Sequence, residues 1–116
     1  VVDDEPALGV ALRRLLLSDH EVDVVTSASA ARERVEAGER YDVILCDLLM
    51  PGMTGMELHA ELEKTFPDLA KRMVFLTGAV STPRARGFLD AVTNARFEKP
   101  IRAEDLRATI ATMLAH

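Results

Sequence analysis

The chain has 116 residues, of which 48% are apolar and 28% are charged. These proportions are typical of a folded globular protein and unlike those of disordered or membrane chains, and the length suits one domain. The formal net charge is −5 and no basic stripe offsets it, so we do not expect direct binding of nucleic acid by this domain. Cys46 is the only cysteine, which excludes an internal disulfide and a cysteine-rich zinc site.

The chain contains no apolar run of about 18 residues, which a membrane span would need, and no signal peptide pattern. We therefore expect a cytoplasmic protein in which residues 1–116 form one domain.

Five short runs rich in β-branched residues alternate with longer helical patterns, which predicts parallel strands joined by crossover helices. The predicted strands are Val1–Val2, Val22–Thr26, Val43–Cys46, Met73–Thr77 and Arg96–Glu98. The first run is too short for a central strand, so we expect the natural chain to begin earlier and this strand to be truncated at its N-terminus.

Apolar spacing and terminal residues predict a first and a second helix between these strands. The first has Pro6 in its first turn and a stripe formed by Leu8, Leu12, Leu15 and Leu16. The second is expected to start at an N-cap, Ser29, to bury Ala31 and Val35, and to end at Gly38.

Three further helices are predicted in the second half of the chain. One carries a stripe of apolar residues and ends at Pro67. The next begins at Thr82 followed by Pro83, and Gly87 lowers its helix propensity. The last covers residues 103–115. The helix that ends at Pro67 has an apolar stripe formed by Met56, Leu58, Leu62 and Phe66. The last helix has one formed by Leu106, Ile110, Met113 and Leu114.

Residues able to carry chemistry follow four of the five predicted strands. The first run ends in Asp3 and Asp4, the third in Asp47, the fourth in Thr77, and the fifth is followed by Lys99. Because ligands of open parallel sheets bind beyond the carboxyl ends of the strands, we expect these side chains to converge there.

Clustered carboxylates favour a hard cation such as Mg²⁺, which would neutralise the repulsion between Asp3 and Asp4. A carboxylate next to such a cation can act as a nucleophile and form an aspartyl phosphate. We assign that role to Asp47, because it ends the apolar run "VILC" and the turn "LLMPGMTG" leaves its side chain accessible.

The segments "VVDDEP", "ILCDLLMPGMTG", "FLTG" and "EKP", in this order and at these separations, make the chain resemble the receiver domain of two-component response regulators over essentially its whole length. The resemblance implies an α/β fold of the flavodoxin-like (βα)5 type, with a doubly wound five-stranded parallel sheet in a three-layer α/β/α arrangement. It also implies a phosphorelay function, in which the aspartate accepts a phosphoryl group from a phosphorylated histidine kinase or histidine phosphotransfer protein.

By the same resemblance, Asp47 is the phosphoacceptor, Asp4 binds Mg²⁺ directly, and Asp3 acts mostly through a water. Leu49 supplies a backbone carbonyl to the metal. Thr77 and Lys99 would contact the phosphoryl oxygens, and the Lys99–Pro100 bond is expected to be cis.

The resemblance also implies that phosphorylation switches the face formed by the fourth helix, fifth strand and fifth helix, which is one option for a homodimer. Related chains commonly carry an aromatic residue three positions before the lysine, where this chain has Arg96. Strand alternation directs Phe97 into the core, so we hypothesise that Arg96 presents a charge on the output face. Gly78, beside Thr77, should leave the phosphoacceptor pocket open and make loss of the phosphoryl group fast.

Several alternatives remain open. Asp3 and Asp4 could be loop acids that cap the first helix, Thr77 a locally bonded strand end, and Lys99 a solvated surface lysine. The other functions weighed are a flavodoxin-like cofactor binder, for which "DDEPAL" lacks a glycine-rich loop, a phosphatase of the haloacid dehalogenase type, which would need a D-x-D pattern, and an interaction module that is not phosphorylated.

The remaining polar and sulfur-containing residues are interpreted as structural. We expect Cys46 and the methionines to fill the core and turns, and the histidines, His20, His59 and His116, to be exposed to solvent.

A receiver assists its own phosphorylation and dephosphorylation and is not a turnover enzyme. Whether it stands alone, is fused to an output domain, or belongs to a hybrid histidine kinase is left open.

Overall fold

The computed structural model describes residues 1–78 and 82–115, and its central feature is a parallel sheet. Strands β1 (Ile44–Asp47), β2 (Met73–Thr77) and β3 (Arg96–Glu98) lie side by side in that order. Val2 extends the sheet beyond β1, since it forms single parallel bridges to Cys46 on one side and to Val25 on the other. The chain therefore passes through the sheet in the doubly wound order of a flavodoxin-like fold.

Three of the five predicted strands are confirmed, with a shift of one residue for β1, and two are not strands in the described residues. Around Val2 and Val25 the pairing is limited to the isolated bridges. Val2 donates to the carbonyl of Leu45 and Val25 donates to the carbonyl of Val1, but residues 1–3 are too few to pair with the whole segment 22–26. The sheet is thus five segments wide but has three strands.

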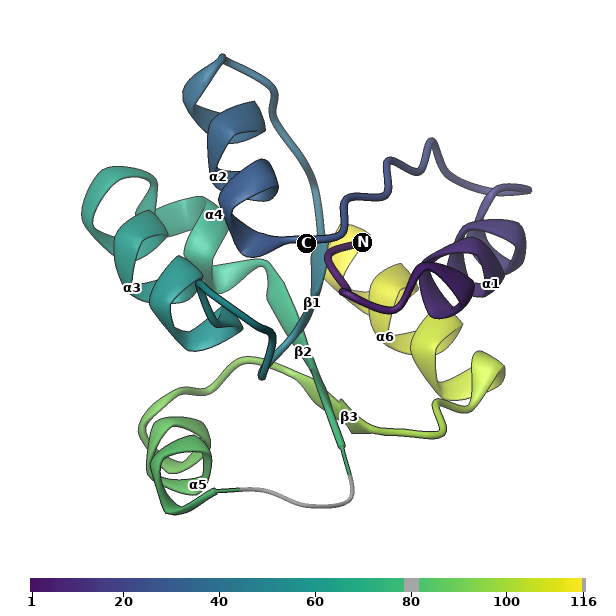
Figure 1. Ribbon diagram of the computed structural model, residues 1–116. Coiled ribbons are helices and arrows are strands. Elements are labelled where there is room, and N and C mark those ends of the chain that lie inside the picture. The colour runs from purple at the N-terminus through teal and green to yellow at the C-terminus, as the bar shows by residue number, and fades with distance from the viewer. Residues whose placement is uncertain (79–81, 116) are drawn as a thin grey trace.

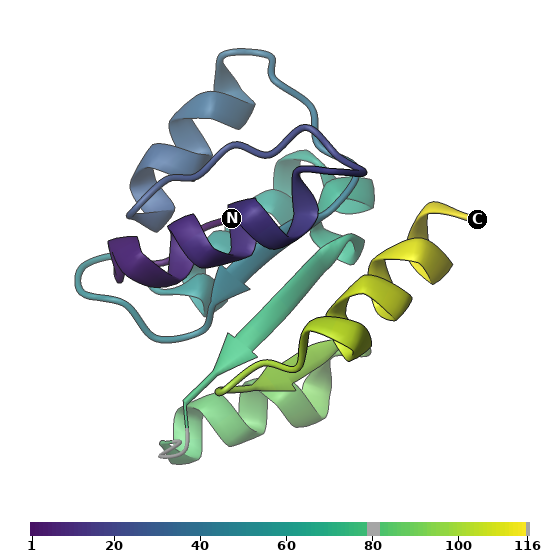
Figure 2. The same ribbon diagram turned by 90° about the vertical axis from the view of Figure 1, so that its right-hand side faces the viewer.

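Helices cover both faces of this sheet (Figure 1). On one face lie α1 (Pro6–Leu16) and α6 (Ala103–Leu114), which Figure 2 shows in front of the strands. The other face carries the helices α2 (Ala28–Glu36), α3 (Gly55–Thr65), the short α4 (Pro67–Lys71) and α5 (Pro83–Ala91). The three-layer α/β/α architecture expected from the sequence is confirmed.

Alternation along the strands divides the core into two clusters. In β2, Phe75 belongs to the cluster under α2, α3 and α5, while Val74 and Leu76 belong to the cluster under α1 and α6. Both clusters are apolar because a central parallel strand is covered on its two faces, and this explains why four of the five residues of β2 are buried.

Local signals set most helix ends, although α2 begins earlier than predicted. The N-cap is Ser27, whose Oγ accepts from the N–H of Ala30 at 3.1 Å, so the assignment of Ser29 was wrong. An earlier start buries Ala28 on the same stripe as Ala31 and Val35, which the later start would lose. The predicted N-cap Thr82 of α5 is confirmed.

The prediction for His59 was wrong. Its side chain lies on the inward face of α3 and the residue is only 6% exposed. The ring makes edge contacts with Phe75 and Phe88, at centroid distances of 5.8 and 5.3 Å. The imidazole thus serves as one member of an aromatic cluster joining α3, β2 and α5. His20 is half-buried, and His116 lies outside the described residues.

Two other sequence predictions are confirmed. Cys46 is fully buried in β1, and the Lys99–Pro100 peptide bond is cis. Within the described ranges, every helix is too short or too polar to cross a membrane.

Candidate functional site

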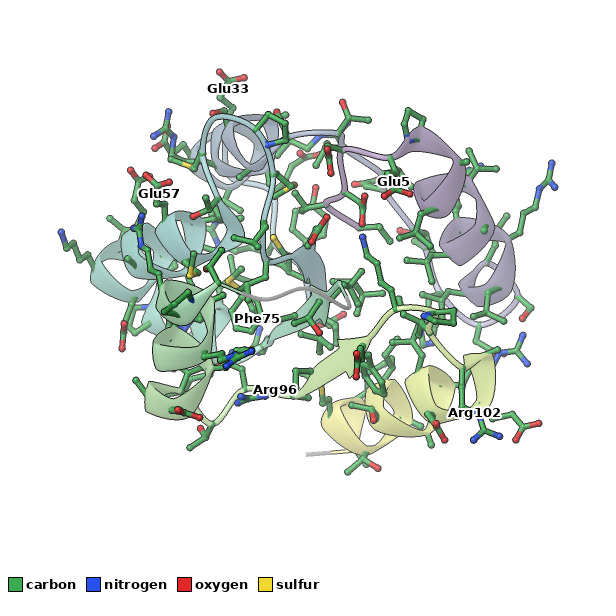
Figure 3. All side chains as sticks on the ribbon, turned by 60° about the horizontal axis from the view of Figure 1, so that its bottom comes forward. Glu5, Glu33, Glu57, Phe75, Arg96 and Arg102 are labelled. Carbon is green, nitrogen blue, oxygen red and sulfur yellow. The ribbon has the colours of Figure 1, made fainter. Side chains whose placement is uncertain are left out.

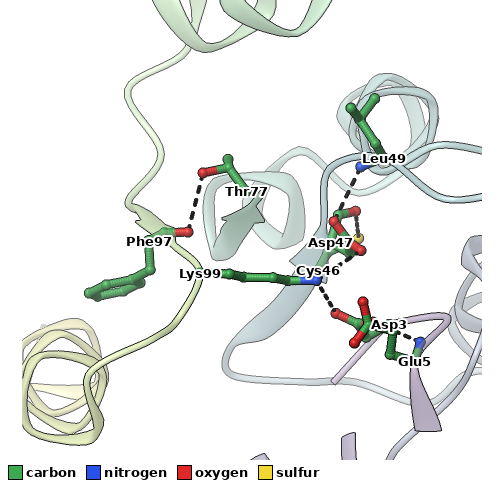
Figure 4. A network of polar contacts seen from close by, with 8 residues as sticks. All are labelled: Asp3, Glu5, Cys46, Asp47, Leu49, Thr77, Phe97 and Lys99. Atoms are coloured by element: carbon green, nitrogen blue, oxygen red, sulfur yellow. Dashed lines mark hydrogen bonds and ion pairs between the residues drawn. The ribbon is translucent and has the colours of Figure 1, made fainter. Parts of the chain in front are cut away.

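The carboxyl ends of the strands bring Asp3, Asp47 and Lys99 together, as predicted from their positions in the sequence. The Nζ of Lys99 lies 3.1 Å from Oδ2 of Asp3 and 3.2 Å from Oδ2 of Asp47 (Figure 4). These three residues come from the first segment of the sheet, from the end of β1 and from the turn after β3. The ammonium group therefore bridges two acids that the chain carries 44 positions apart, at 3 and 47.

Asp3 is held in place by the backbone around it. Its N–H donates to the carbonyl of Val25 at 3.2 Å, and its Oδ1 accepts from the N–H of Glu5 at 2.8 Å. The residue has no exposed surface. A fully buried carboxylate needs a charged or hydrogen-bonding partner on each oxygen. Lys99 is the partner of Oδ2, and the N–H of Glu5 is the partner of Oδ1.

Asp47 ends β1 and is only 7% exposed, so the prediction that the following turn leaves its side chain accessible was wrong. Its Oδ1 accepts from the N–H of Leu49 at 3.3 Å, while Oδ2 faces Lys99. Burial raises the pKa of the Asp47 carboxyl, and the Lys99 ammonium partly opposes this rise. For Lys99, burial alone would lower the pKa, but hydrogen bonds to Asp3 and Asp47 raise it above its ordinary value. The lysine is thus held in its charged form.

The acid cluster suits a divalent cation. Carboxylate oxygens of Asp3, Asp4 and Asp47 lie within 4.8 Å of one another, and Asp4 is exposed. Three carboxylates against one ammonium leave an excess of two negative charges. Oxygen ligands with a side open to solvent are the environment that Mg²⁺ prefers, because it keeps several waters. The donor set therefore fits the expected metal.

Thr77 is turned away from Asp47. It ends β2, is partly buried, and its hydroxyl donates to the carbonyl of Phe97 in β3 at 3.4 Å (Figure 4). The structure thus places Thr77 at the same edge of the sheet as the acids, but its hydroxyl does not join their network. Gly78, the next residue, is exposed, and residues 79–81 lie outside the described part.

Arg96 and Phe97 take opposite sides of β3. Phe97 is partly buried and packs against the core cluster under α1 and α6, the inward position that alternation predicts. Arg96 is exposed, but its guanidinium donates to backbone carbonyls at the C-terminal end of α5. Its charge is therefore already engaged within the domain.

Gly55 supports the site and was not singled out from the sequence. A Cβ at this position would overlap the carbonyl oxygen of Asp47 and would lie 3.1 Å from the Cα of Leu48. Only a residue without a side chain allows α3 to begin this close to β1. The signal was present, because Gly55 follows Thr54, the N-cap of α3.

Two other features of the domain do not belong to the site. Burial raises the pKa of the Cys46 thiol to about 12, so this sulfur next to Asp47 stays protonated and unreactive. A cavity of about 600 Å³, lined in part by Val1, Val22, Val43 and Leu114, lies at the opposite, amino-terminal ends of the strands. It shares no residue with the acid cluster.

Comparison with known proteins agrees with this geometry. Residues 1–111 match the family model described as the response regulator receiver domain. The transcriptional regulatory protein TcrA of Mycobacterium tuberculosis is 33% identical over 111 residues, which cover 95% of this chain and 43% of that protein. The response regulator MprA of Mycobacterium leprae is 32% identical over 114 residues, which cover 97% of this chain and 49% of that protein.

Solved structures give the same result. A CheY-like response regulator receiver domain protein from Methanospirillum hungatei JF-1 superimposes with a TM-score of 0.85 at 27% identity, covering 98% of this chain and 90% of that one. The chain spans slightly less than half the length of TcrA and MprA. The match of the family model over nearly the whole chain, together with this fold, shows that the chain belongs to the response regulator receiver domain family.

Proposed function

We propose that this domain accepts a phosphoryl group on Asp47 in an Mg²⁺-dependent reaction and thereby switches its output face. The observation that carries the proposal is the bridge from Lys99 to Asp47 and Asp3, with Asp4 beside them. This arrangement supplies a nucleophilic carboxylate, a fixed cation and a set of oxygen ligands at one sheet edge. Phosphoryl transfer depends mainly on such positioning and charge stabilisation.

The proposed reaction uses a phosphohistidine of a partner protein as donor. An oxygen of Asp47 bonds to phosphorus, the bond from phosphorus to the histidine nitrogen breaks, and that nitrogen takes up a proton. Asp4, Asp47 and the backbone carbonyl of Leu49 would hold Mg²⁺, with Asp3 acting through a water. When bound, the metal would neutralise charge on the phosphoryl oxygens.

Lys99 and Thr77 would contact the transferred group. Lys99 already lies within hydrogen-bonding distance of Asp47. The hydroxyl of Thr77 must leave the carbonyl of Phe97 to reach a phosphoryl oxygen. The proposed site is therefore partly preformed and partly completed by phosphorylation.

The proposed partner is a histidine kinase or histidine phosphotransfer protein in the cytoplasm. The output face comprises α5, β3 and α6, and a homodimer would use the same face. TcrA is described as a transcriptional regulatory protein, so an output domain outside residues 1–116 is one arrangement for the parent protein. The activity of such an output domain would lie outside residues 1–116.

Intact-mass analysis with Mg²⁺ and a small phosphoryl donor tests the proposal. We expect the parent domain to gain the mass of one phosphoryl group, and the Asp47→Asn variant to gain none. Asp42→Asn is the matched control, because Asp42 is exposed and lies before β1. Asp4→Asn should raise the Mg²⁺ concentration needed for the reaction. Labelling that persists in Asp47→Asn would refute the assignment.

A further inference from the structure

Arg96 begins β3, and its side chain reaches back to the C-terminal end of α5. Nη1 donates to the carbonyl of Leu89 at 2.7 Å, and Nη2 donates to the carbonyl of Val92 at 2.9 Å. Nη2 and Nε also donate to the carbonyl of Asn94, at 3.1 and 3.4 Å. Figure 3 shows the side chain between β3 and α5. The guanidinium thus donates hydrogen bonds to carbonyl groups at the C-terminal end of α5.

The end of α5 needs such a partner. The last carbonyl groups of a helix receive no hydrogen bond from an N–H group within the helix, and this end of the helix carries a partial negative charge. The last turn of α5 contains no basic residue, and the C-cap, Val92, is extended. Arg96 supplies from the neighbouring strand the positive charge that α5 does not provide for itself.

Apolar packing also holds α5 on the sheet, because Leu89 and Val92 lie against the core cluster under α2, α3 and α5. Ala85 is the only buried residue within this helix, and Phe88 joins the aromatic cluster at a centroid distance of 5.2 Å from Phe75. The apolar side of α5 is thus attached by packing along its length. Arg96 adds the polar contacts to the carbonyl groups at its C-terminal end.

The same strand connects Arg96 with the acid cluster. β3 has three residues, and Lys99 follows directly after it. The N–H of Lys99 donates to the carbonyl of Thr77 at 2.8 Å, and the hydroxyl of Thr77 donates to the carbonyl of Phe97. Hydrogen bonds thus join Thr77 to Phe97 and Lys99, and Arg96 is the residue before Phe97.

We propose, on the basis of the function proposed above, that Arg96 is a latch that holds the C-terminal end of α5 on β3 and that a phosphoryl group on Asp47 weakens it. The phosphoryl oxygens would compete for the ammonium of Lys99 and for the hydroxyl of Thr77. The hydroxyl would then leave the carbonyl of Phe97, the residue that follows Arg96. The latch and the phosphoryl group therefore favour different positions of β3.

Thermodynamic linkage makes this coupling measurable from either side. If a phosphoryl group weakens the latch, then removal of the latch must strengthen binding of a phosphoryl group, by at most the same factor. A residue that only caps a helix would change stability without changing that affinity. The affinity of the site for a phosphoryl analogue separates these two roles.

Binding of beryllofluoride in the presence of Mg²⁺ provides the test. We expect Arg96→Gln to bind beryllofluoride about fivefold more tightly than the parent domain, or better. Arg107→Gln is the matched control, because Arg107 in α6 donates to the carbonyl of Leu15 in the last turn of α1, at 2.9 Å. It removes the same kind of contact away from β3 and should leave the affinity unchanged.

Amide hydrogen exchange in the unmodified domain gives a second readout. The N–H of Val92 donates to the carbonyl of Phe88, and its exchange should become faster when beryllofluoride binds. If Arg96→Gln does not fold, Arg96→Lys keeps the charge but loses the planar set of donors and should show the same increase in affinity.

The outcomes separate the two proposals. Equal beryllofluoride affinity in the parent domain and a folded Arg96 variant, or unchanged Val92 exchange, would overturn the latch alone. Absence of beryllofluoride binding in the parent domain would overturn the phosphoacceptor function, and the latch with it.

Discussion

The ammonium of Lys99 lies 3.2 Å from Oδ2 of Asp47, although 52 positions separate the two residues in the chain. The same ammonium lies 3.1 Å from Oδ2 of Asp3, which is completely buried. Lys99 is therefore the positive charge that makes the buried Asp3 carboxylate tolerable in the absence of a metal. The proposed catalytic lysine also has a structural role.

Replacement of Lys99 by methionine should lower the free energy of unfolding by about 1–3 kcal/mol, because it leaves buried Asp3 without its charged partner. Mg²⁺ should restore part of this loss, since the cation would replace the missing positive charge. Urea denaturation with and without Mg²⁺ measures both effects. Lys64→Met, at an exposed position of α3, is the control. Equal stability of the two variants without Mg²⁺ would contradict the structural role of Lys99.

Two glycines should respond to alanine in opposite directions. At Gly55 the added Cβ would overlap the carbonyl oxygen of Asp47, so we expect Gly55→Ala to lower the free energy of unfolding by about 1–3 kcal/mol. At Gly87, inside α5, a Cβ would meet no atom within 4 Å. Gly87→Ala should therefore raise the free energy of unfolding by about 0.5–1 kcal/mol through better helix propensity. Denaturation midpoints that move in the same direction would disprove this interpretation of the Gly55 contact.

Strong local patterns predicted much of the fold. The limits of β2 were predicted to the residue because an apolar run lies between Arg72 and Gly78. The start of α2 was misplaced because Ser27 and Ser29 are equally good N-caps, and only the packing of Ala28 decides between them. The short helix α4, which begins at Pro67, was missed because its five residues have no visible periodicity.

The candidate site was predictable where it depends on topology. Parallel strands place their carboxyl ends at one edge, so the convergence of Asp3, Asp47 and Lys99 follows from strand order alone. The surroundings of His59 and Arg96 were not predictable. They depend on which side chains and carbonyls of other elements lie opposite, and neither composition nor spacing contains that information.

His59 should make the stability of the domain depend on pH. Burial lowers the pKa of its imidazole, and Glu63 on the same helix opposes this only in part. A histidine with a lowered pKa in the folded state binds protons more readily when unfolded. Stability from this residue is therefore fully present above the unfolded value, near 6.5, and is lost as the pH falls below it.

Denaturation of the parent domain between pH 7.5 and about 5 should accordingly show a falling free energy of unfolding. The His59→Leu variant, which does not titrate at this position, should show a shallower fall. His20→Gln removes a histidine outside the aromatic cluster and should keep the slope that His59 causes. Parallel curves for the parent domain and His59→Leu would rule out His59 as the source.

Gly78 should make the proposed phosphoryl group on Asp47 short-lived. The residue is exposed, and a Cβ built on it would meet no atom within 4 Å, so among the described residues no side chain fills the space around this position, next to Thr77. A larger side chain at this position should exclude water from the acyl phosphate. We expect Gly78→Leu to lengthen the phosphoryl lifetime several-fold, measured by intact mass after removal of the donor. Gly87→Ala, on α5, should not change the lifetime. A lifetime of many hours in the parent domain, or an equal lifetime in Gly78→Leu, would show that access of water at Gly78 does not limit the aspartyl phosphate.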